Sequence, residues 1–208
     1  MKRLFKVREI YRSFSKLKLK SLIKKLRSLQ NENGSISAMN RNIESADMRF
    51  AFCAAFLHYV FHVEGLSSID TGATSEWILS CFSPQAAFGQ VPGAEAHSAA
   101  TYCALASLTL LSGGGELTML GEKRRQRLIR FCVNRQSQGI HGRIQKTDDS
   151  CYTFWTGAAL SLLTREKLLD LEALSKFISS CANPIGGGVA KFPGTPPDPN
   201  HSFMSLGN

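Results

Sequence analysis

The segment Tyr152-Thr-Phe-Trp-Thr-Gly-Ala-Ala-Leu160 contains no charged residue and is apolar on nearly all sides. Small and aromatic side chains in such a run are typical of a helix that is buried all round. Three other segments share this pattern, and their aligned aromatic residues lie 50, 52 and 49 positions apart: Phe52, Tyr102, Phe154 and Phe203. A repeat of about fifty residues therefore organises the chain.

Amphipathic stretches lie between the apolar segments, for example at residues 122–135 and 165–181. Turns rich in Gln and Gly separate the two kinds of segment. Alternation of buried and amphipathic helices at a fixed period predicts an all-α fold built from helical pairs. Such pairs stack either into a solenoid or into an α/α barrel of inner and outer helices.

The net charge of +9 belongs to one segment rather than to the whole chain. Residues 1–27 contain eleven Lys and Arg side chains against one acid, Glu9, whereas the remaining residues contain 14 basic and 15 acidic ones. We therefore divide the chain into a basic helical segment, residues 1–27, and a repeat region, residues 28–208. A solvated helix face, organelle targeting and an acidic protein partner all fit the charge. We expect no nucleic-acid partner, because the segment lacks the platform on which bases stack.

The remaining composition predicts a cytoplasmic protein. No apolar stretch approaches the length of a membrane-spanning helix, and the lysines at the N-terminus are unlike a secretory signal. The six cysteines are tens of residues apart and mostly lie inside apolar patterns, which is typical of reduced thiols.

The reactive residues fall at one place in the repeat. Arg49, His97, Asp149, Cys151 and His201 all lie at or just before the start of an apolar segment, so we expect them on one rim of the assembly. A carboxylate, a thiolate and an imidazole are ligands that zinc accepts, and three of them leave a fourth position open for chemistry. The alternative is a buried cysteine beside a surface histidine.

A second group on the same rim is suited to an anion. Arg143 and Lys146 flank a turn, Tyr152 begins the third apolar segment, and His97 precedes the second. Two cations with imidazole and phenol donors could neutralise a diphosphate, although a solvated loop would have the same residue types. The aromatic residues of the apolar segments would line a cavity for a long apolar ligand in a barrel, or else form ordinary core.

The sequence resembles the β subunits of the protein prenyltransferases, and most of all those of geranylgeranyltransferase type I. The resemblance covers roughly residues 20–208. It rests on Asp47-Met-Arg-Phe-Ala-Phe-Cys-Ala-Ala55, Glu95-Ala-His97, Thr101-Tyr-Cys-Ala-Leu-Ala-Ser-Leu108, His141-Gly-Arg-Ile-Gln-Lys146, Asp149-Ser-Cys-Tyr-Thr-Phe-Trp155, Gly186-Gly-Gly-Val-Ala-Lys-Phe-Pro193 and Asp198-Pro-Asn-His201.

The resemblance implies an α/α barrel, or α-α toroid, whose inner helices surround an isoprenoid funnel. It also implies that the barrel is incomplete in this chain. It places the catalytic zinc ligands, for one zinc ion per heterodimer, at Asp149, Cys151 and His201. It places diphosphate contacts at His97, Arg143, Lys146, Tyr152 and Lys191. It places the lipid pocket at Arg49, Cys103 and Trp155.

The activity implied by the resemblance is transfer of a geranylgeranyl group from its diphosphate to the cysteine of a C-terminal CaaX motif, through a zinc-bound thiolate. The implied partners are a prenyltransferase α subunit, geranylgeranyl diphosphate and CaaX-terminated small GTPases. Lys191 stands where farnesyltransferases carry a magnesium-binding aspartate, so we expect no magnesium requirement. Ser98-Ala99 and Gln145 depart from the Gly-Gly and Asn of the family.

Two other functions fit parts of the sequence. A catalytically incomplete repeat module could bind an α subunit or an isoprenoid without turnover, because the chain is shorter than the family by two or three helical pairs. A terpene cyclase on a related barrel is disfavoured, because the sequence has no Asp-rich cluster of the kind that such cyclases use.

Overall fold

The computed structural model describes residues 16–40, 42–62, 65–115 and 117–206. Most of the basic segment predicted at residues 1–27 lies outside these ranges, and the division of the chain at residue 27 stays a prediction. The described residues form α-helices, short 3-10 turns and isolated bridges, without a strand among them.

Helices of two kinds alternate along the chain. The inner helices are α3 (Met48–His62), α5 (Ser98–Leu111), α7 (Tyr152–Leu162) and α9 (Pro199–Leu206). The outer helices are α2 (Lys16–Leu29), α4 (Thr71–Ser80), α6 (Gly121–Val133) and α8 (Leu171–Cys181). The 3-10 turns are η1 (Ile43–Ser45), η2 (Thr118–Leu120) and η3 (Glu166–Leu168).

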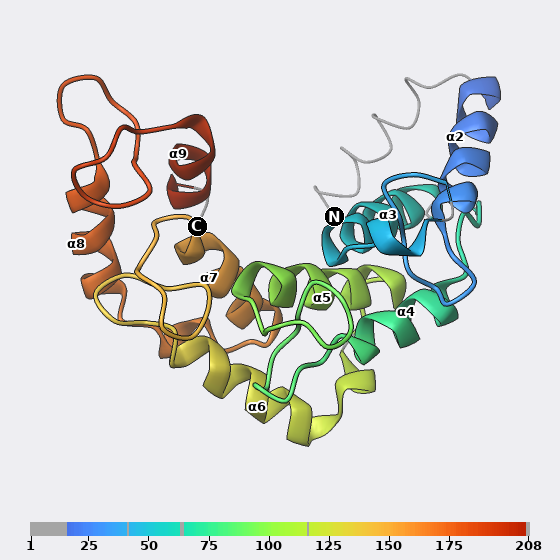
Figure 1. Cartoon of the computed structure of the whole chain (residues 1–208), viewed down its shortest axis with the longest axis horizontal. Helices are drawn as coiled ribbons and strands as arrows, with labels where there is room; N and C mark the ends of the chain where they lie inside the picture. Colours follow the sequence, from blue (N-terminus) through green and yellow to red (C-terminus); the bar gives the residue numbers. More distant parts are fainter. Residues whose placement is uncertain (1–15, 41, 63–64, 116, 207–208) are drawn as a thin grey trace.

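The helices follow an open arc with the inner helices on its concave side (Figure 1). Neighbouring inner helices pack against each other in the order α3, α5, α7, α9. The predicted all-α barrel of inner and outer helices is therefore confirmed, and within the described residues its wall is not closed.

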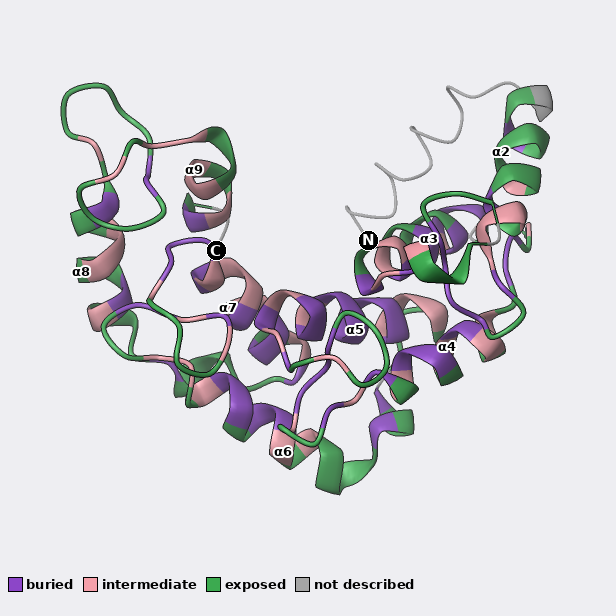
Figure 2. Ribbon diagram, in the orientation of Figure 1, coloured by how far each residue is buried: buried purple, intermediate pink, exposed green. Residues whose placement is uncertain are grey.

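The burial of the inner helices depends on their place in the arc. In the middle, α5 buries Ala104, Leu105 and Leu108 completely, and Figure 2 shows it as the most continuously buried helix. At the two ends, Phe56 of α3 is 46% exposed and Phe203 of α9 is 69% exposed. The prediction of burial all round is wrong for these two helices, because each has an inner neighbour on one side only within the described residues.

The outer helices are joined by a recurring clamp. Asp70 and Asp170 cap α4 and α8 by accepting a hydrogen bond from the amide three residues later, at 3.0 Å in both cases. The side-chain amides of Gln30 and Gln136 then bond to both backbone groups of these aspartates, at 2.8 and 2.9 Å. The end of one outer helix is thus attached to the start of the next outer helix, α2 to α4 and α6 to α8.

Backbone hydrogen bonds also fix each turn to the inner helix before it. The amides of Met48, Ser98 and Ser150 donate to the carbonyls of Gln90, Gly142 and Lys191, each at 2.9 Å. The turn that follows an outer helix therefore lies on the N-terminal end of the preceding inner helix. This arrangement brings side chains from two repeats together on one rim.

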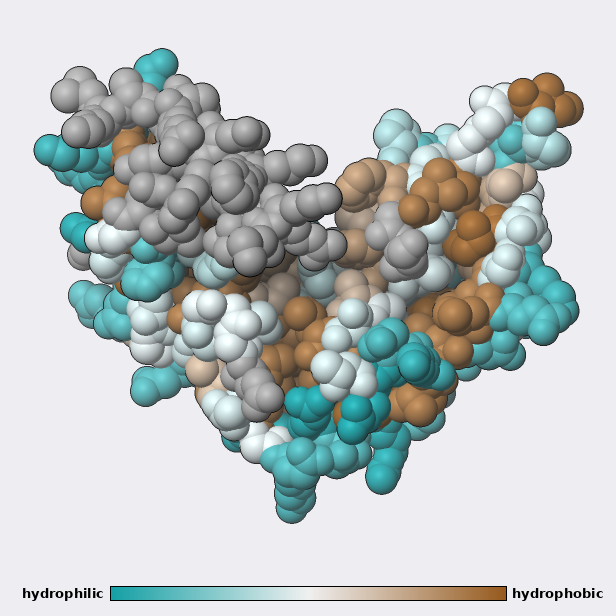
Figure 3. Space-filling view, turned by 180° about the vertical axis from the view of Figure 1, so that it is seen from behind, coloured by the Kyte–Doolittle hydropathy of each residue, from teal (hydrophilic) through white to brown (hydrophobic). Residues whose placement is uncertain are grey.

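Two surface properties complete the fold. Seen from behind, apolar side chains gather near the middle of the molecule, and polar ones project along the lower edge formed by α6 (Figure 3). No helix among the described residues is long and apolar enough to cross a membrane.

The six cysteines are all free thiols, and Cys53 alone among them is exposed.

Candidate functional site

Asp149, Cys151 and His201 form a compact group of metal-ligand types. One ligand atom from each lies within 4.8 Å of the others, and Asp149 and Cys151 are buried. Asp149 and Cys151 lie just before α7, with Cys151 at its N-cap, and His201 comes from the first turn of α9. The structure thus brings together the three residues that were predicted as a zinc site, from two consecutive inner helices.

The backbone between the repeats explains why these residues meet. Ser150 is fully buried, and its amide donates to the carbonyl of Lys191, as described above. Its hydroxyl donates to the carbonyl of Ala190 at 2.7 Å. The turn that precedes α9 is thereby tied to the two residues that flank Ser150. The carboxylate of Asp149 also accepts a hydrogen bond from the amide of Cys151 at 3.0 Å, which fixes its direction.

Asp198 orients the imidazole of His201. Its carboxylate accepts a hydrogen bond from the amide of His201 at 3.0 Å and forms a short contact with Nδ1 of the ring. The amide and the ring of His201 together lower the pKa of Asp198. Because Nδ1 is occupied, Nε2 faces Asp149, with Oδ1 at 3.3 Å.

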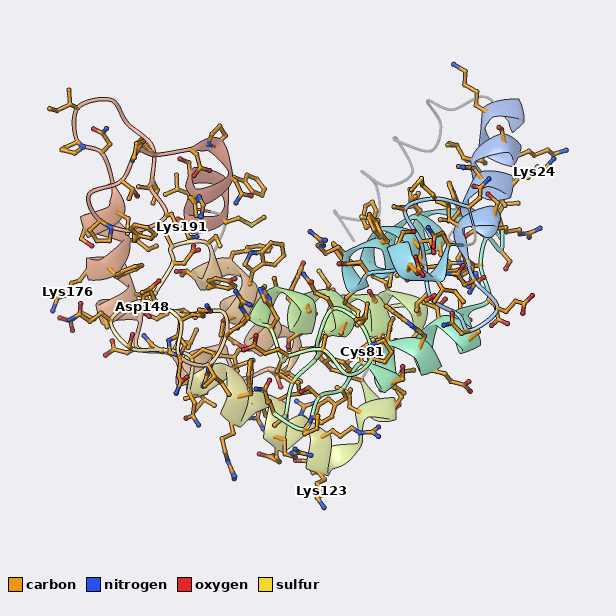
Figure 4. The ribbon with its side chains drawn as sticks, in the orientation of Figure 1. Lys24, Cys81, Lys123, Asp148, Lys176 and Lys191 are labelled. Atoms are coloured by element: carbon orange, nitrogen blue, oxygen red, sulfur yellow. The ribbon has the colours of Figure 1, made fainter. Side chains whose placement is uncertain are left out.

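The electrostatics of this group favour a cation. Burial and the adjacent Asp149 carboxylate raise the pKa of the Cys151 thiol. The ammonium of Lys191, whose position in Figure 4 is between α8 and α7, lies 3.7 Å from Oδ2 of Asp149. A divalent cation would relieve the repulsion between a thiolate and this carboxylate, and the sulfur, nitrogen and oxygen donors fit zinc.

His97 and Tyr152 form a neutral pair of donors beside the metal-ligand group. Nδ1 of His97 accepts a hydrogen bond from the amide of Ala99 at 3.1 Å, so the neutral ring carries its proton on Nε2. Nε2 lies 3.1 Å from Oη of Tyr152 and donates to it, which leaves the phenol proton available for another acceptor.

The surroundings keep both groups uncharged near pH 7. Burial, followed by the Arg143 guanidinium, lowers the pKa of His97. Burial, together with Cys151 and Asp149, raises the pKa of Tyr152 to about 12. Near pH 7 the phenol of Tyr152 therefore keeps its proton and can donate a hydrogen bond to an anion, while neutral His97 donates to the phenol oxygen.

Arg143 and Lys146 lie in the loop between α6 and α7. Arg143 forms an ion pair with Glu95 at 3.4 Å, and both side chains are about two-fifths exposed. Gly142 explains the approach of this loop, because a Cβ at that position would lie 2.0 Å from the Tyr152 ring. Lys146 is exposed further along the same loop.

The three residues predicted to line a lipid pocket differ from one another in burial and in contacts. Cys103 is buried in α5, and burial raises its pKa to about 12. Trp155 packs on Tyr102 with ring centroids 5.5 Å apart. Arg49 is instead 65% exposed and forms an ion pair with Asp47 at 2.8 Å.

The aligned aromatics of the repeat do meet across the inner helices. Tyr102 contacts Phe52 on one side and Phe154 on the other, with ring centroids 5.7 and 5.3 Å apart. A groove of ≈ 780 Å³ runs beside them between α7, α8 and α9. Apolar side chains such as Phe154, Leu162 and Ile178 form much of its lining, which suits a long apolar ligand, and serines form most of the rest.

Two acids that act on the site were missed in the sequence, Asp148 and Asp198. The i, i+3 spacing of Asp198 and His201 was visible as a signal, since a capping carboxylate at the start of a helix reaches this distance. Asp148 has no comparable signal, because its role depends on how a loop folds back.

A family profile described as the prenyltransferase alpha-alpha toroid domain matches residues 3–208. The geranylgeranyl transferase type-1 subunit beta of Dictyostelium discoideum is 38% identical over 193 residues, 93% of this chain and 53% of that protein. The protein of the same name from Arabidopsis thaliana is 38% identical over 191 residues, 88% of this chain and 50% of that protein. The chain spans about half the length of these curated relatives.

A solved structure shares the arrangement of helices. The Candida albicans protein geranylgeranyltransferase-I complexed with GGPP aligns with a TM-score of 0.75 over 88% of this chain and 57% of that one. Sequence identity is 23%, so this likeness concerns the fold.

Proposed function

The chain belongs to the prenyltransferase alpha-alpha toroid family, and from this premise we propose that it supplies the catalytic face of a type I protein geranylgeranyltransferase β subunit. The reaction would transfer a geranylgeranyl group to the cysteine thiol of a CaaX C-terminus. The observation that carries the proposal is the position of Asp149, Cys151 and His201 beside the His97–Tyr152 pair. A metal-ligand group and an anion-binding group thereby share one rim.

Zinc held by Asp149, Cys151 and His201 would lower the pKa of a substrate thiol, so that the thiolate exists at neutral pH. The chain's own residues hold these ligands ready. Asp198 keeps the Nε2 of His201 directed at the site, and the Cys151 amide fixes the Asp149 carboxylate.

The second group receives the leaving diphosphate. As the bond to C1 of the isoprenoid breaks, negative charge grows on the diphosphate oxygens, and donors fixed beforehand stabilise it. The phenol of Tyr152 has a free proton for this purpose, and Arg143 supplies a cation beside His97. Lys146 would close on the diphosphate from the same loop.

Lys191 would replace a magnesium ion. Its ammonium already lies 3.7 Å from Asp149, so it can offset negative charge beside the metal-ligand group, as a magnesium ion would. We therefore propose that transfer needs zinc but no added magnesium. Replacing Lys191 with Ala should slow transfer, and added magnesium should recover part of the rate. Equal rates for the variant and the wild type would contradict this role.

The relatives are named as beta subunits of geranylgeranyl transferases, which supports a geranylgeranyl donor and a second subunit. We propose a prenyltransferase α subunit as partner in a cytoplasmic heterodimer and geranylgeranyl diphosphate as the donor, with CaaX-terminated small GTPases as the acceptors that the resemblance implies. The aromatic row of Phe52, Tyr102 and Phe154, with the adjoining groove, would hold the isoprenoid chain.

Zinc content tests the proposal directly. The chain is co-expressed with a prenyltransferase α subunit, and metal is measured by mass spectrometry. We expect about one zinc ion per heterodimer, loss of zinc in Cys151→Ser, and retention in Cys181→Ser. Cys181 is a matched control, because it is also buried but lies at the end of α8.

Transfer assays separate the two functions considered above. Zinc binding with transfer of geranylgeranyl to a CaaX peptide supports the enzyme. Zinc or isoprenoid binding without transfer supports a binding module instead. Absence of zinc in the wild-type heterodimer contradicts the proposed site.

A further inference from the structure

Two neighbouring acids at the start of α7 face different parts of the site. Asp149 belongs to the metal-ligand group. Asp148 instead reaches into the loop that carries Arg143 and Lys146, in the region between α7 and α8 (Figure 4). Its side chain is only 16% exposed, and a buried carboxylate is stable only when its oxygens are hydrogen-bonded.

The carboxylate of Asp148 connects the two limbs of this loop. The hydroxyl of Ser137 reaches both of its oxygens, at 2.7 and 2.6 Å, and the amide of Gly139 donates to Oδ2 at 2.8 Å. Nδ1 of His141 lies 3.4 Å from Oδ1. One side chain at the end of the loop thus holds three residues at its beginning.

Close packing restricts the same limb from both sides. A Cβ at Gly139 would lie 2.5 Å from the Phe177 ring of α8, and one at Gly142 would lie 2.0 Å from the Tyr152 ring of α7. The amide of Asp149 donates to the carbonyl of Ile140 at 3.0 Å and so joins the two limbs of the loop at its base. Residues 144–147 are exposed, so the position of the cations depends on this fixed limb.

The charge of Asp148 is unfavourable for the proposed function. A carboxylate in the same loop as two cations adds a negative charge that works against the binding of an anion. Its three contacts within the loop therefore provide the better explanation for its presence, because they hold the cations in place before the anion arrives.

We propose that Asp148 is a positioning residue that fixes the loop of Arg143 and Lys146 for diphosphate binding. This inference rests on the proposed function. It also predicts that loss of the Asp148 charge weakens anion binding, whereas charge alone would strengthen it. Replacing Asp148 with Asn removes a negative charge, which by itself would tighten binding of an anion. The same change replaces a charged acceptor by a neutral amide oxygen, which weakens the hydrogen bonds from Ser137 and Gly139 and so loosens the loop.

The test measures binding of inorganic pyrophosphate and of geranylgeranyl diphosphate by calorimetric titration of the zinc-loaded heterodimer. We expect Asp148→Asn to bind pyrophosphate about tenfold more weakly, which corresponds to about 1.4 kcal/mol. Asp148→Ala should bind still more weakly. The zinc content should stay at the wild-type value, because Asp149 is unchanged.

Glu172→Gln is the matched control. Glu172 lines the same surface cavity as Asp148 and undergoes the same change of charge, but its carboxylate bonds to Lys176. This variant should bind pyrophosphate as the wild type does. In an Arg143→Gln background, Asp148→Asn should have a smaller further effect, because Lys146 is then the one remaining cation that it positions.

The outcomes distinguish this inference from the proposed function. If the wild-type heterodimer binds neither zinc nor diphosphate, both are overturned. If the wild type binds and Asp148→Asn binds equally or more tightly, the positioning role alone is overturned, even if the variant melts earlier. Should Asp148→Asn fail to fold, Ser137→Ala removes one exposed donor to the same carboxylate, and unchanged affinity in that variant overturns the role.

Discussion

His201 receives its orientation from Asp198, which bonds to both its amide and its ring. Partners of this kind hold a metal-binding imidazole in one tautomer, and their loss typically lowers metal affinity about 10- to 100-fold. We expect Asp198→Asn to weaken zinc binding within this range, measured by competition with a chromophoric chelator. Glu122→Gln, which changes an acid on the outer helix α6, should bind zinc normally.

Gly142 tests the packing between the loop and α7. Because a Cβ there would overlap the Tyr152 ring, Gly142→Ala should displace the phenol from His97 and lower the melting temperature. It should also weaken pyrophosphate binding. Gly72→Ala is the control, since Gly72 lies in the first turn of α4 with its nearest neighbour at 3.4 Å, and its melting temperature should stay the same or rise slightly. Equal behaviour of the two variants would contradict the packing argument.

The residues of the site could be predicted from sequence to different degrees. Asp149, Cys151 and His201 were found because the repeat places all three at the starts of inner helices, and the structure brings them together. Asp148 was not found, because its contacts depend on a loop that folds back over ten residues. The place of Arg49 in the lipid pocket stays a prediction; its ion pair with Asp47, which local geometry decides, was not predicted.

Among the helices, the clamp between outer helices recurs with different chemistry. Gln30 and Gln136 use hydrogen bonds to the backbone of a capping aspartate. After α4, Phe82 occupies the corresponding position, as its bridge to Phe88 indicates, and the guanidinium groups of Arg124 and Arg127 lie 5.8 and 5.4 Å from its ring. Arginines on α6 that look like a solvated charged face therefore take part in joining the repeats.

Removing one clamp should destabilise the array measurably. Gln136→Ala loses two hydrogen bonds to Asp170, and each is worth about 1 kcal/mol, so we expect the melting temperature to fall by about 4–8 °C. Gln126→Ala is a suitable comparison, because Gln126 bonds to Glu122 within the exposed face of α6. A fall of the same size in both variants would show that the clamp has no special role.

The helices were easier to predict than the joints between them. Apolar periodicity located all four inner helices and the outer helices α6 and α8, because burial decides these patterns. The clamps escaped prediction, since a Gln after a helix has no single preferred partner. The exposed faces of α3 and α9, the inner helices at the two ends of the arc, were also missed, because exposure depends on which helices surround them.

Across the whole molecule, several free thiols lie deep in the core. Cys132 is completely buried, and burial raises its pKa to about 12; Cys81 and Cys103 are raised to the same value for the same reason. Above pH 9 the unfolded chain releases these protons, whereas the folded chain retains them up to about pH 12. Folding stability should therefore fall as the pH rises through this window.

The loss of folding stability at alkaline pH can be measured by following the melting temperature from about pH 8 to about pH 10.5. Each buried thiol contributes up to about 1.4 kcal/mol per pH unit at the steepest part. Cys132→Ala should lower stability at pH 8 through lost packing, but its decline with pH should be shallower than that of the wild type. Parallel curves would contradict a contribution from this thiol.

Each of the three backbone hydrogen bonds at the rim joins neighbouring repeats. Met48, Ser98 and Ser150 each donate to the turn of the next repeat, so none of these bonds spans the whole array. Such contacts can form as soon as the next repeat has been synthesised, because they need no residues from later repeats. Each pair can therefore settle on the one before it while the ribosome is still adding residues. A nascent chain that has released α7 already contains everything needed to set His97 against Tyr152, whereas the metal-ligand group must await the last helix.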